Sequence, residues 1–437
     1  MTVDYAPSDS LYLWWLAHPA QPRLVGHLRL LRRSGQHPGG VSLEYASEWL
    51  SRGLALSEDL PLQAGEFLPS MLDAAAGAVE DARPDRWGER VIRLLERPAR
   101  LSLLEYLYFA GDERFGALGV STSATTYLPR HHGPLPTLAD VQVLHDLIRQ
   151  VEAGETIDEV LRRLVTPGAT LGGARPKDLL QMEGSAWVIK FSEAGEVLDS
   201  PLIEHACMRL AASAGIEVCE TRALPLQKGH ALAVRRFDRQ VEGSKQQRLH
   251  AQSAHVALRA AGQELGYPEL ALLLRRRAPA DEFGAQGEQL FRRMVFNILI
   301  DNTDDHEKNH ALLMTPTQHW RLSPAFDVLP SGHALGYQQM RVGLQGAEST
   351  LRNALSEHRA FALTLAQAQQ VAAQVAQVVS CWQEAFASQG VKATDVALLA
   401  QAIDRPFLKA QRDALLHWQA PQASATKGRT RSSKRST

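Results

Sequence analysis

The residues best suited to chemistry stand in one polar stretch, residues 302–309, which reads NTDDHEKN. This polar loop follows an apolar run of helical period and holds Asp304 and Asn309 in the spacing D-x-x-x-x-N. In protein kinases an Asp at this spacing accepts the proton of the substrate hydroxyl, and the Asn binds a Mg²⁺ that bridges the phosphates. Two residues at a fixed spacing also occur by chance about once in a chain of this length, so their context decides what they mean.

A second carboxylate follows where such a site needs one. After the polar loop the sequence predicts a small hairpin, residues 311–314 and 319–322, and then a loop that carries Asp327. A kinase keeps its second metal-binding carboxylate on a loop beyond a hairpin, although the sequence here is Phe-Asp-Val and not Asp-Phe-Gly. Helix, polar loop, hairpin and second Asp therefore occur in the order that a kinase uses.

The same stretch contains a competing motif. His306, Glu307 and His310 form the H-E-x-x-H of zinc metalloproteases, in which two His on one helix face bind zinc and the Glu is the general base. The segment follows a completed helix and precedes a strand, which leaves little room for two helical turns. Lys308 also places a cation where metalloproteases have an uncharged residue, and a third ligand is missing. These points favour the kinase interpretation over the zinc site.

Lysine is rare in this chain, with 9 Lys against 38 Arg and none before Lys177. Lys177 follows Gly172 and Gly173, whose missing side chains let backbone N–H groups approach a phosphate. Neither a P-loop nor a G-x-G-x-x-G motif is present. A tight turn before a hairpin explains the same residues equally well, so both interpretations stay open.

Lys190 lies inside the apolar strand expected from WVIKF, where alternate residues face opposite sides. Trp187, Ile189 and Phe191 should share one face, and Val188 and Lys190 the other. A buried ammonium group needs a partner because an unpaired charge is costly in an apolar environment. A nucleotide phosphate and Glu204 on the next predicted helix are both candidates, and an edge strand facing water is the plain alternative.

The elements that carry these residues change in character along the chain. The sequence predicts a β-containing region over residues 1–135, a strand-rich region over 136–255, a helical region over 256–420 and a disordered basic tail over 421–437. The clearest predicted elements are strands at 24–31, 41–45, 115–120, 178–182, 186–191, 218–223 and 230–237, and helices at 202–214, 286–301, 359–388 and 394–418.

Composition excludes several classes of protein. The chain has 437 residues, 45% of them hydrophobic and 22% charged, with a net charge of −1. This is a globular composition, and the balanced charge does not suit a bulk nucleic-acid binder. Three scattered Cys form no CxxC pair, the N-terminus lacks the basic region of a signal peptide, and no apolar run is long enough for a membrane span. A cytoplasmic protein without membrane contact is expected.

Taken together, these segments resemble the HipA family, the kinase toxins of bacterial HipBA-type toxin–antitoxin pairs. The most specific pieces are NTDDHEKN and residues 236–239 (RFDR), supported by residues 25–26 (VG) and 115–117 (FGA) in the N-terminal part. The resemblance covers about residues 20 to 415 and leaves out the tail. It implies an α+β, two-lobed protein-kinase-like (PI3/4-kinase-like) fold, with an N-terminal β-containing subdomain and a mostly α-helical C-terminal lobe.

The resemblance also implies roles for single residues in binding ATP and Mg²⁺. Asp304 would be the catalytic base, and Asn309 and Asp327 would bind Mg²⁺. Lys190 would contact the ATP phosphates, the loop of Gly172, Gly173 and Lys177 would cover them, and Arg235, Arg236 and Phe237 would form the hinge that meets adenine. His306 and Lys308 belong to the catalytic loop, where Lys308 would stabilise the transferring phosphoryl group. The family autophosphorylates a Ser before the Gly-rich loop, and the matching residue here is Thr170.

The partners that the resemblance implies are a protein substrate, such as an aminoacyl-tRNA synthetase, and a small helix-turn-helix antitoxin. DNA would be reached only indirectly, through the antitoxin. Two alternatives stay open. One is a catalytically weak or inactive HipA-like protein that binds the antitoxin as a corepressor. The other is a small-molecule kinase of the same architecture, which only a test of substrates would separate from a protein kinase.

Overall fold

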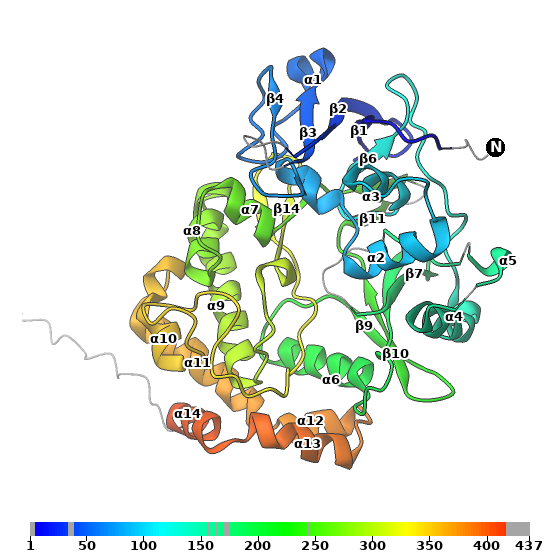
Figure 1. The fold of residues 1–437 in the computed structure, drawn as a ribbon. Coiled ribbons are helices and arrows are strands. Elements are labelled where there is room, and N and C mark those ends of the chain that lie inside the picture. The colour runs from blue at the N-terminus through cyan, green and yellow to red at the C-terminus, as the bar shows by residue number, and fades with distance from the viewer. Residues whose placement is uncertain are drawn as a thin grey trace, which may run out of the picture.

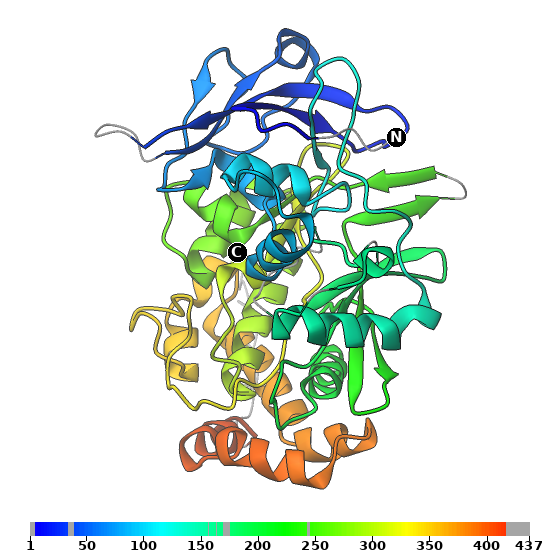
Figure 2. The same ribbon diagram turned by 45° about the vertical axis from the view of Figure 1, so that its right-hand side comes forward.

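The computed structural model describes residues 5–33, 39–155, 157–162, 164–168, 175–242 and 245–416. Thr170, Gly172 and Gly173 lie outside the described residues, as does the basic tail of residues 421–437. Figure 2 shows three parts: an N-terminal sheet at the top, a smaller sheet with its helices below it on the right, and a helical part that ends at the bottom.

The N-terminal sheet and the short helices packed on it form one layer, which we call the N-terminal unit (residues 10–121). The strand order is β4-β3-β2-β1-β6, with β5 paired to β3. The strands are β1 Ser10–Trp15, β2 Arg23–Leu31, β3 Gly40–Tyr45, β4 Glu66–Phe67, β5 Ala74–Ala75 and β6 Leu118–Ser121. The helices are α1 Ser47–Arg52, η1 Gly77–Ala82, α2 Arg86–Val91, η2 Ile92–Glu96 and α3 Leu103–Phe109.

The small sheet has the antiparallel order β7-β8-β10-β9 and separates two hydrophobic cores. Its strands are β7 Lys177–Met182, β8 Ser185–Lys190, β9 Thr221–Pro225 and β10 His230–Arg235. Trp187, Ile189 and Phe191 pack with α4 (Val141–Ala153), whereas Val188 packs with α6 (Ser200–Ser213) and Lys190 reaches a residue of the same helix. The predicted alternation along this strand is confirmed. The short helices η3 (Leu138–Asp140) and α5 (Glu159–Arg162) flank α4.

The helical part is built around α9 (Phe283–Leu299), which contributes Leu290, Phe291, Met294, Val295 and Phe296 to the largest core. A three-stranded sheet of order β13-β14-β15 lies beside it and holds the polar loop before β14. Its strands are β13 Ala251–Ser253, β14 Ala311–Met314 and β15 Trp320–Leu322. The other helices are α7 Ala254–Ala260, α8 Tyr267–Arg277, η4 Glu307–Asn309, α10 Leu351–Ser356, η5 His358–Phe361, α11 Leu365–Val379, α12 Trp382–Ser388, α13 Ala393–Ile403 and α14 Pro406–Leu416 (Figure 1).

Several predicted boundaries are wrong. The strand expected at 218–223 lies at 221–225, because Val218 pairs only with Ala325 as an isolated bridge. The region beyond residue 255 is less helical than expected, since residues 323–350 contain no helix. The two long helices expected at 359–388 and 394–418 are each divided, by a capping box at Thr364 and by Pro406, which begins a new helix.

Six strands were not expected from the sequence: β1, β4, β5, β11, β12 and β13. β1 lies between β2 and β6 and is buried along most of its length, so its residues SLYLWW show no clean alternation of apolar and polar residues. The hairpin of β11 (Arg239–Glu242) and β12 (Lys245–Arg248) is polar except for Val241, and β4, β5 and β13 are only two or three residues long. Among the described residues, none of the helices has the length and apolar composition needed to cross a membrane.

A buried ion cluster joins the N-terminal unit to the end of β10, and we call it the Asp238 cluster. Asp238 accepts hydrogen bonds from Arg236, Arg239 and the backbone N–H of Gly116, each at 2.8 Å. Both Arg side chains also donate to the carbonyl of Arg114. Burial alone would raise the pKa of Asp238, but the two guanidinium charges outweigh burial and hold it well below its usual range. The RFDR and FGA segments therefore meet in this cluster.

Candidate functional site

Lys190 connects three elements at the inner face of the small sheet. Its ammonium group on β8 pairs with Glu204 of α6 at 2.7 Å and with Asp327, which follows β15. The Lys190–Glu204 ion pair expected from the sequence is therefore present. Burial would lower the pKa of Lys190, but the two carboxylates raise it, so the residue stays protonated. The arrangement fixes one cation between two carboxylates from distant parts of the chain.

Asp327 takes a backbone conformation that few residues adopt. Its φ is 57°, in the left-handed region that Asp and Asn tolerate better than most side chains. The preceding Phe326 packs against Phe237, with ring centroids 5.3 Å apart, and Phe237 in turn contacts Phe115 of the N-terminal unit at 6.0 Å. The hinge residue expected from the sequence therefore lies directly beside the loop that presents Asp327.

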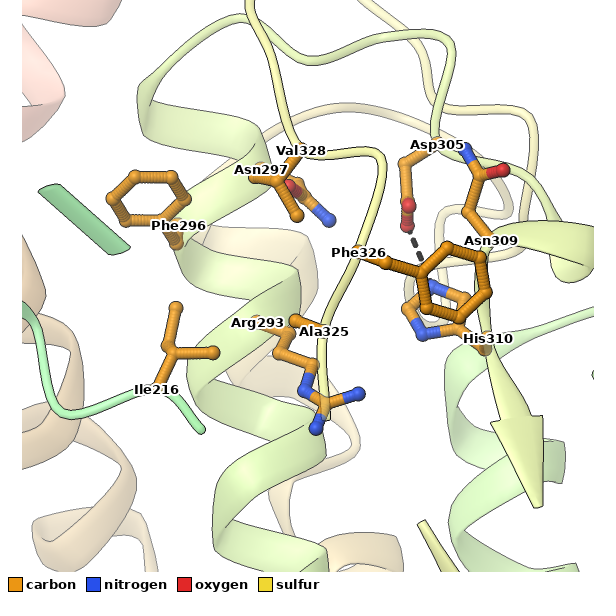
Figure 3. A pocket seen from close by; sticks show the side chains of 10 residues that line it. All are labelled: Ile216, Arg293, Phe296, Asn297, Asp305, Asn309, His310, Ala325, Phe326 and Val328. Carbon is orange, nitrogen blue, oxygen red and sulfur yellow. Dashed lines mark hydrogen bonds and ion pairs between the residues drawn. The ribbon is translucent and has the colours of Figure 1, made fainter. Parts of the chain in front are cut away.

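Buried hydrogen bonds support the polar loop on the side that faces the protein interior. Asp305 accepts from the Tyr267 hydroxyl and lies 2.8 Å from Nε2 of His310, and Asn302 donates to Asn297 of α9 at 3.1 Å. Figure 3 shows the Asp305 carboxylate directed toward His310, with Asn309 beside Asp305. A cavity of only about 10 Å³ is left between the loop and α9. Three of the four Asn residues therefore belong to one buried framework or to the loop that it supports.

Asp304 points the other way. It is exposed, whereas the adjacent Asp305 is 1% exposed. Asp304, His306 and Lys308 line a cleft of about 880 Å³ between the polar loop and the N-terminal unit. Of the two neighbouring carboxylates, only Asp304 can meet a group that enters the cleft. The opposite wall of the cleft comes from residues 80–89, which include Glu80, Asp81, Arg83, Asp85 and Glu89.

Asn309 carries the feature that best fits a metal ion. Its side-chain Oδ1 is buried and accepts no hydrogen bond from the described part of the chain. An amide oxygen and a carboxylate such as Asp327 are ligands that Mg²⁺ accepts, with water and phosphate oxygens completing its shell. No group of three or more His, Cys, Asp or Glu side chains among the described residues could hold a metal alone. The residues present therefore fit Mg²⁺ bound together with a phosphate, as in a nucleotide complex.

The zinc-protease alternative loses its structural basis. His306 and His310 both have extended backbone, and the helix between them is a single 3₁₀ turn of three residues. The two His therefore do not share an α-helical face, which the motif requires. Glu307 and His310 are also engaged in other contacts, Glu307 with His255 at 2.6 Å and His310 with Asp305 at 2.8 Å.

The remaining nucleotide-site candidates lie in different environments. Lys177 stands opposite Lys190 in the β7–β8 register, is 1% exposed and contacts Asp85 of the N-terminal unit at 2.6 Å. The Arg236 side chain is directed into the Asp238 cluster, and Arg235 lies on the surface beside Glu220. Adenine contacts at this hinge would therefore fall to backbone groups and to Phe237.

Sequence reasoning missed the residues that support the loop, above all Tyr267, Asp305 and His310. Residues 303 and 304 form a turn, so no helix or strand periodicity in the sequence separates the buried Asp305 from the exposed Asp304. Tyr267 comes from α8, and nothing in its own surroundings in the sequence indicates that it reaches the loop.

Comparison with known proteins was informative for both halves of the chain. Residues 20–121 match the HipA N-terminal domain, and residues 169–382 match the HipA-like C-terminal domain. The putative kinase Y4dM of Sinorhizobium fredii is 29% identical over 158 residues, which make up 33% of this chain and 37% of that protein. The alignment thus spans little more than a third of this relative's length.

Solved structures show where the fold belongs. HipA of Shewanella oneidensis MR-1, determined with HipB and its operator DNA, aligns over 92% of this chain and 97% of its own, with a TM-score of 0.63 and 16% identity. A proinflammatory kinase of Helicobacter pylori, CtkA, aligns over 56% of this chain and 91% of its own, with a TM-score of 0.41 and 14% identity. The α+β, two-lobed kinase-like fold with an N-terminal β-containing part is confirmed by the Shewanella structure.

Proposed function

Because this chain belongs to the HipA family, we propose that it is an ATP- and Mg²⁺-dependent serine/threonine protein kinase. One observation carries the proposal: Lys190 is joined to the buried Glu204 and to the partly exposed Asp327, while Asn309 Oδ1 is buried without a partner in the described chain. Carboxylate and amide oxygens of this kind are ligands that Mg²⁺ accepts, which favours a kinase over a protein that only binds another protein.

When bound, ATP supplies the phosphoryl group and Mg²⁺ neutralises the charge on the phosphates. Each residue of the site would then have a separate role in the reaction. Asp304 accepts the proton of the attacking Ser or Thr hydroxyl, and Lys308 stabilises the negative charge that develops on the transferring group. Asn309 and Asp327 hold the cation, while Lys190 keeps Asp327 ionised and offers its ammonium group to the phosphates.

The nucleotide would lie with its adenine at the hinge formed by Arg235, Arg236 and Phe237. Gly172, Gly173 and Lys177 would cover the phosphates, and Thr170 is the candidate for autophosphorylation. Lys177 would have to exchange its contact with Asp85 for a phosphate oxygen, or share its protons between the two. His306 lines the same cleft, and its buried Nδ1 has no hydrogen-bond partner within the described chain.

The proposal includes a biological setting. The protein would act in the cytoplasm as the toxin of a type II pair, phosphorylating a translation component such as an aminoacyl-tRNA synthetase. A small helix-turn-helix antitoxin would hold it and bring it to DNA. The Shewanella HipA structure, which contains HipB and operator DNA, supports this part of the proposal. The three regions 1–135, 136–255 and 256–420 would be the N-terminal subdomain, the small lobe and the large lobe.

The proposal is tested with purified protein and labelled ATP, by following label transfer to the protein itself and to candidate synthetases. Asp304→Gln should abolish transfer while ATP binding persists, because the base is lost and the nucleotide contacts remain. Asp413→Asn, an exposed carboxylate on α14 far from the cleft, is the matched control and should transfer at the wild-type rate. Equal labelling by Asp304→Gln and wild type would refute the assignment of the base. ATP binding without transfer by any form would favour the corepressor instead.

A further inference from the structure

The N-terminal unit reaches the polar loop through α7 and the strand β13 that leads into this helix. α7 contacts both η1 of the N-terminal unit and η4 of the polar loop. At its start, Asp81 of η1 accepts hydrogen bonds from Ser253, at 2.7 Å from the backbone N–H and at 2.6 Å from the hydroxyl. Ser253 is also the N-cap of α7, because its Oγ accepts from the backbone N–H of Val256. Asp81 therefore fixes the first turn of this helix.

The other contact of α7 is with the polar loop. Nδ1 of His255 lies 2.6 Å from Oε1 of Glu307, and the two side chains are only 14% and 15% exposed. Glu307 stands between His306 and Lys308, which face the cleft.

These contacts form a continuous path from Asp81 through Ser253 and His255 to Glu307. Asp81 and Ser253 are 172 positions apart in the sequence, and His255 and Glu307 are 52 positions apart. No local conformational preference therefore produces these contacts. It ends on Glu307, which His255 of α7 contacts at the wall of the cleft. Tyr267 and His310 hold the same loop from below.

We propose that His255 is a positioning residue for phosphoryl transfer, which holds the polar loop at Glu307, and that the N-terminal unit takes part by fixing α7 through Asp81. The inference rests on the proposed kinase function, which it deepens by giving the N-terminal unit a part in catalysis. Misplacing a catalytic group by about 1 Å costs on the order of 100-fold in rate. Releasing the polar loop at Glu307 should therefore lower kcat more than it lowers the affinity for the nucleotide.

The test compares His255→Ala with the conservative His255→Gln, whose amide can still donate to Glu307. His255→Ala should lower kcat by about 10- to 100-fold and change the KM for ATP less than about twofold, and His255→Gln should recover most of the rate. Asp81→Ala should lower kcat as well, but it should add little in the His255→Ala background, because both act along one path.

A matched control and a second readout separate positioning from general stability. Glu58→Gln removes a different ion pair between the N-terminal unit and the helical part, with Arg276 at 3.4 Å, and should leave kcat unchanged. Hydrogen exchange of the peptide that spans residues 300–312 should become faster in His255→Ala and stay slow in His255→Gln. Wild-type kcat with wild-type exchange in His255→Ala would overturn the inference, and so would faster exchange throughout the chain.

The exchange measurement needs no catalysis, so the two proposals can fail separately. If wild type transfers no phosphoryl group, the proposed kinase function is refuted. In that event, faster exchange confined to the polar loop in His255→Ala still supports the positioning contact, and unchanged exchange still overturns it.

Discussion

Replacing Asp238 by Asn should destabilise this protein more than any surface charge change. The substitution keeps the shape and one oxygen for the Gly116 N–H, but it removes the carboxylate charge that Arg236 and Arg239 share at hydrogen-bond distance. The side chains of the two Arg are only 2% and 11% exposed. Breaking a buried ion pair by removing one partner costs about 3–5 kcal/mol, because the remaining charge stays buried and uncompensated.

The pH dependence of this contribution has a definite sign. The pKa of Asp238 is lower in the folded than in the unfolded chain, so the unfolded state binds the proton more readily. The stabilisation is therefore fully present above the unfolded pKa of about 3.9 and is lost only as the pH falls below it toward the folded value. The difference between wild type and Asp238→Asn should stay constant from pH 8 to pH 5.

The assay is urea denaturation at low ionic strength, since guanidinium salts would screen the charges. Glu113→Gln is the matched control: it lies in the same cluster at 3.6 and 3.7 Å from Arg239 and Arg236, but its side chain is 32% exposed. It should cost only about 0–1 kcal/mol. Equal stability of the two variants would refute the argument that burial makes Asp238 critical. In addition, Arg239→Gln should cost less in the Asp238→Asn background than in wild type, because the pair is already broken.

Three further outcomes are expected. Lys190→Met leaves the buried Glu204 carboxylate and the partly exposed Asp327 carboxylate without their cation, so it should abolish ATP binding by calorimetry and cost about 3–5 kcal/mol in urea; an ATP affinity within twofold of wild type would contradict the phosphate role. Asn309→Ala should leave the melting temperature without nucleotide unchanged, because its Oδ1 has no partner within the described chain, and should remove the extra stabilisation by Mg²⁺ with ATP; an unaltered Mg²⁺ effect would exclude it as a ligand. Burial lowers the pKa of His250 to about 4, so the folded state keeps it neutral while the unfolded state binds a proton below about pH 6.5. Protonation of His250 should therefore lower the free energy of unfolding by up to about 3 kcal/mol as the pH falls from about 6.5 to 4. His250→Gln should show a flatter profile of unfolding free energy against pH, and parallel profiles would refute the assignment.

Much of the candidate site could be predicted because its parts are local in sequence. The polar loop brings Asp304, His306, Lys308 and Asn309 together within six residues. The face of β8 that carries Lys190 follows from strand alternation alone, and the ion pair with Glu204 needs only the next helix. Elements with regular periodicity and their order along the chain were therefore accessible without a structure.

Boundaries and supports were less accessible, for physical reasons. β1 and β13 are defined by their neighbours in a sheet, and the residues between 323 and 350 are held by isolated contacts with distant segments. The roles of Arg236 and Lys177 show the same limit. The sequence predicts a nucleotide contact for each, yet each buried side chain has a protein partner, Arg236 in the Asp238 cluster and Lys177 at Asp85.

The sequence by itself determined which groups could do chemistry and in what order they occur, because residue type, spacing and alternation act over a few positions. The tertiary structure decided which of them face the cleft. Asp304 is exposed while Asp305 is buried by Tyr267 and His310, and Asp81 reaches the polar loop through Ser253 and α7. Such choices depend on packing between segments as far as 172 positions apart in the sequence, and no local preference encodes those contacts.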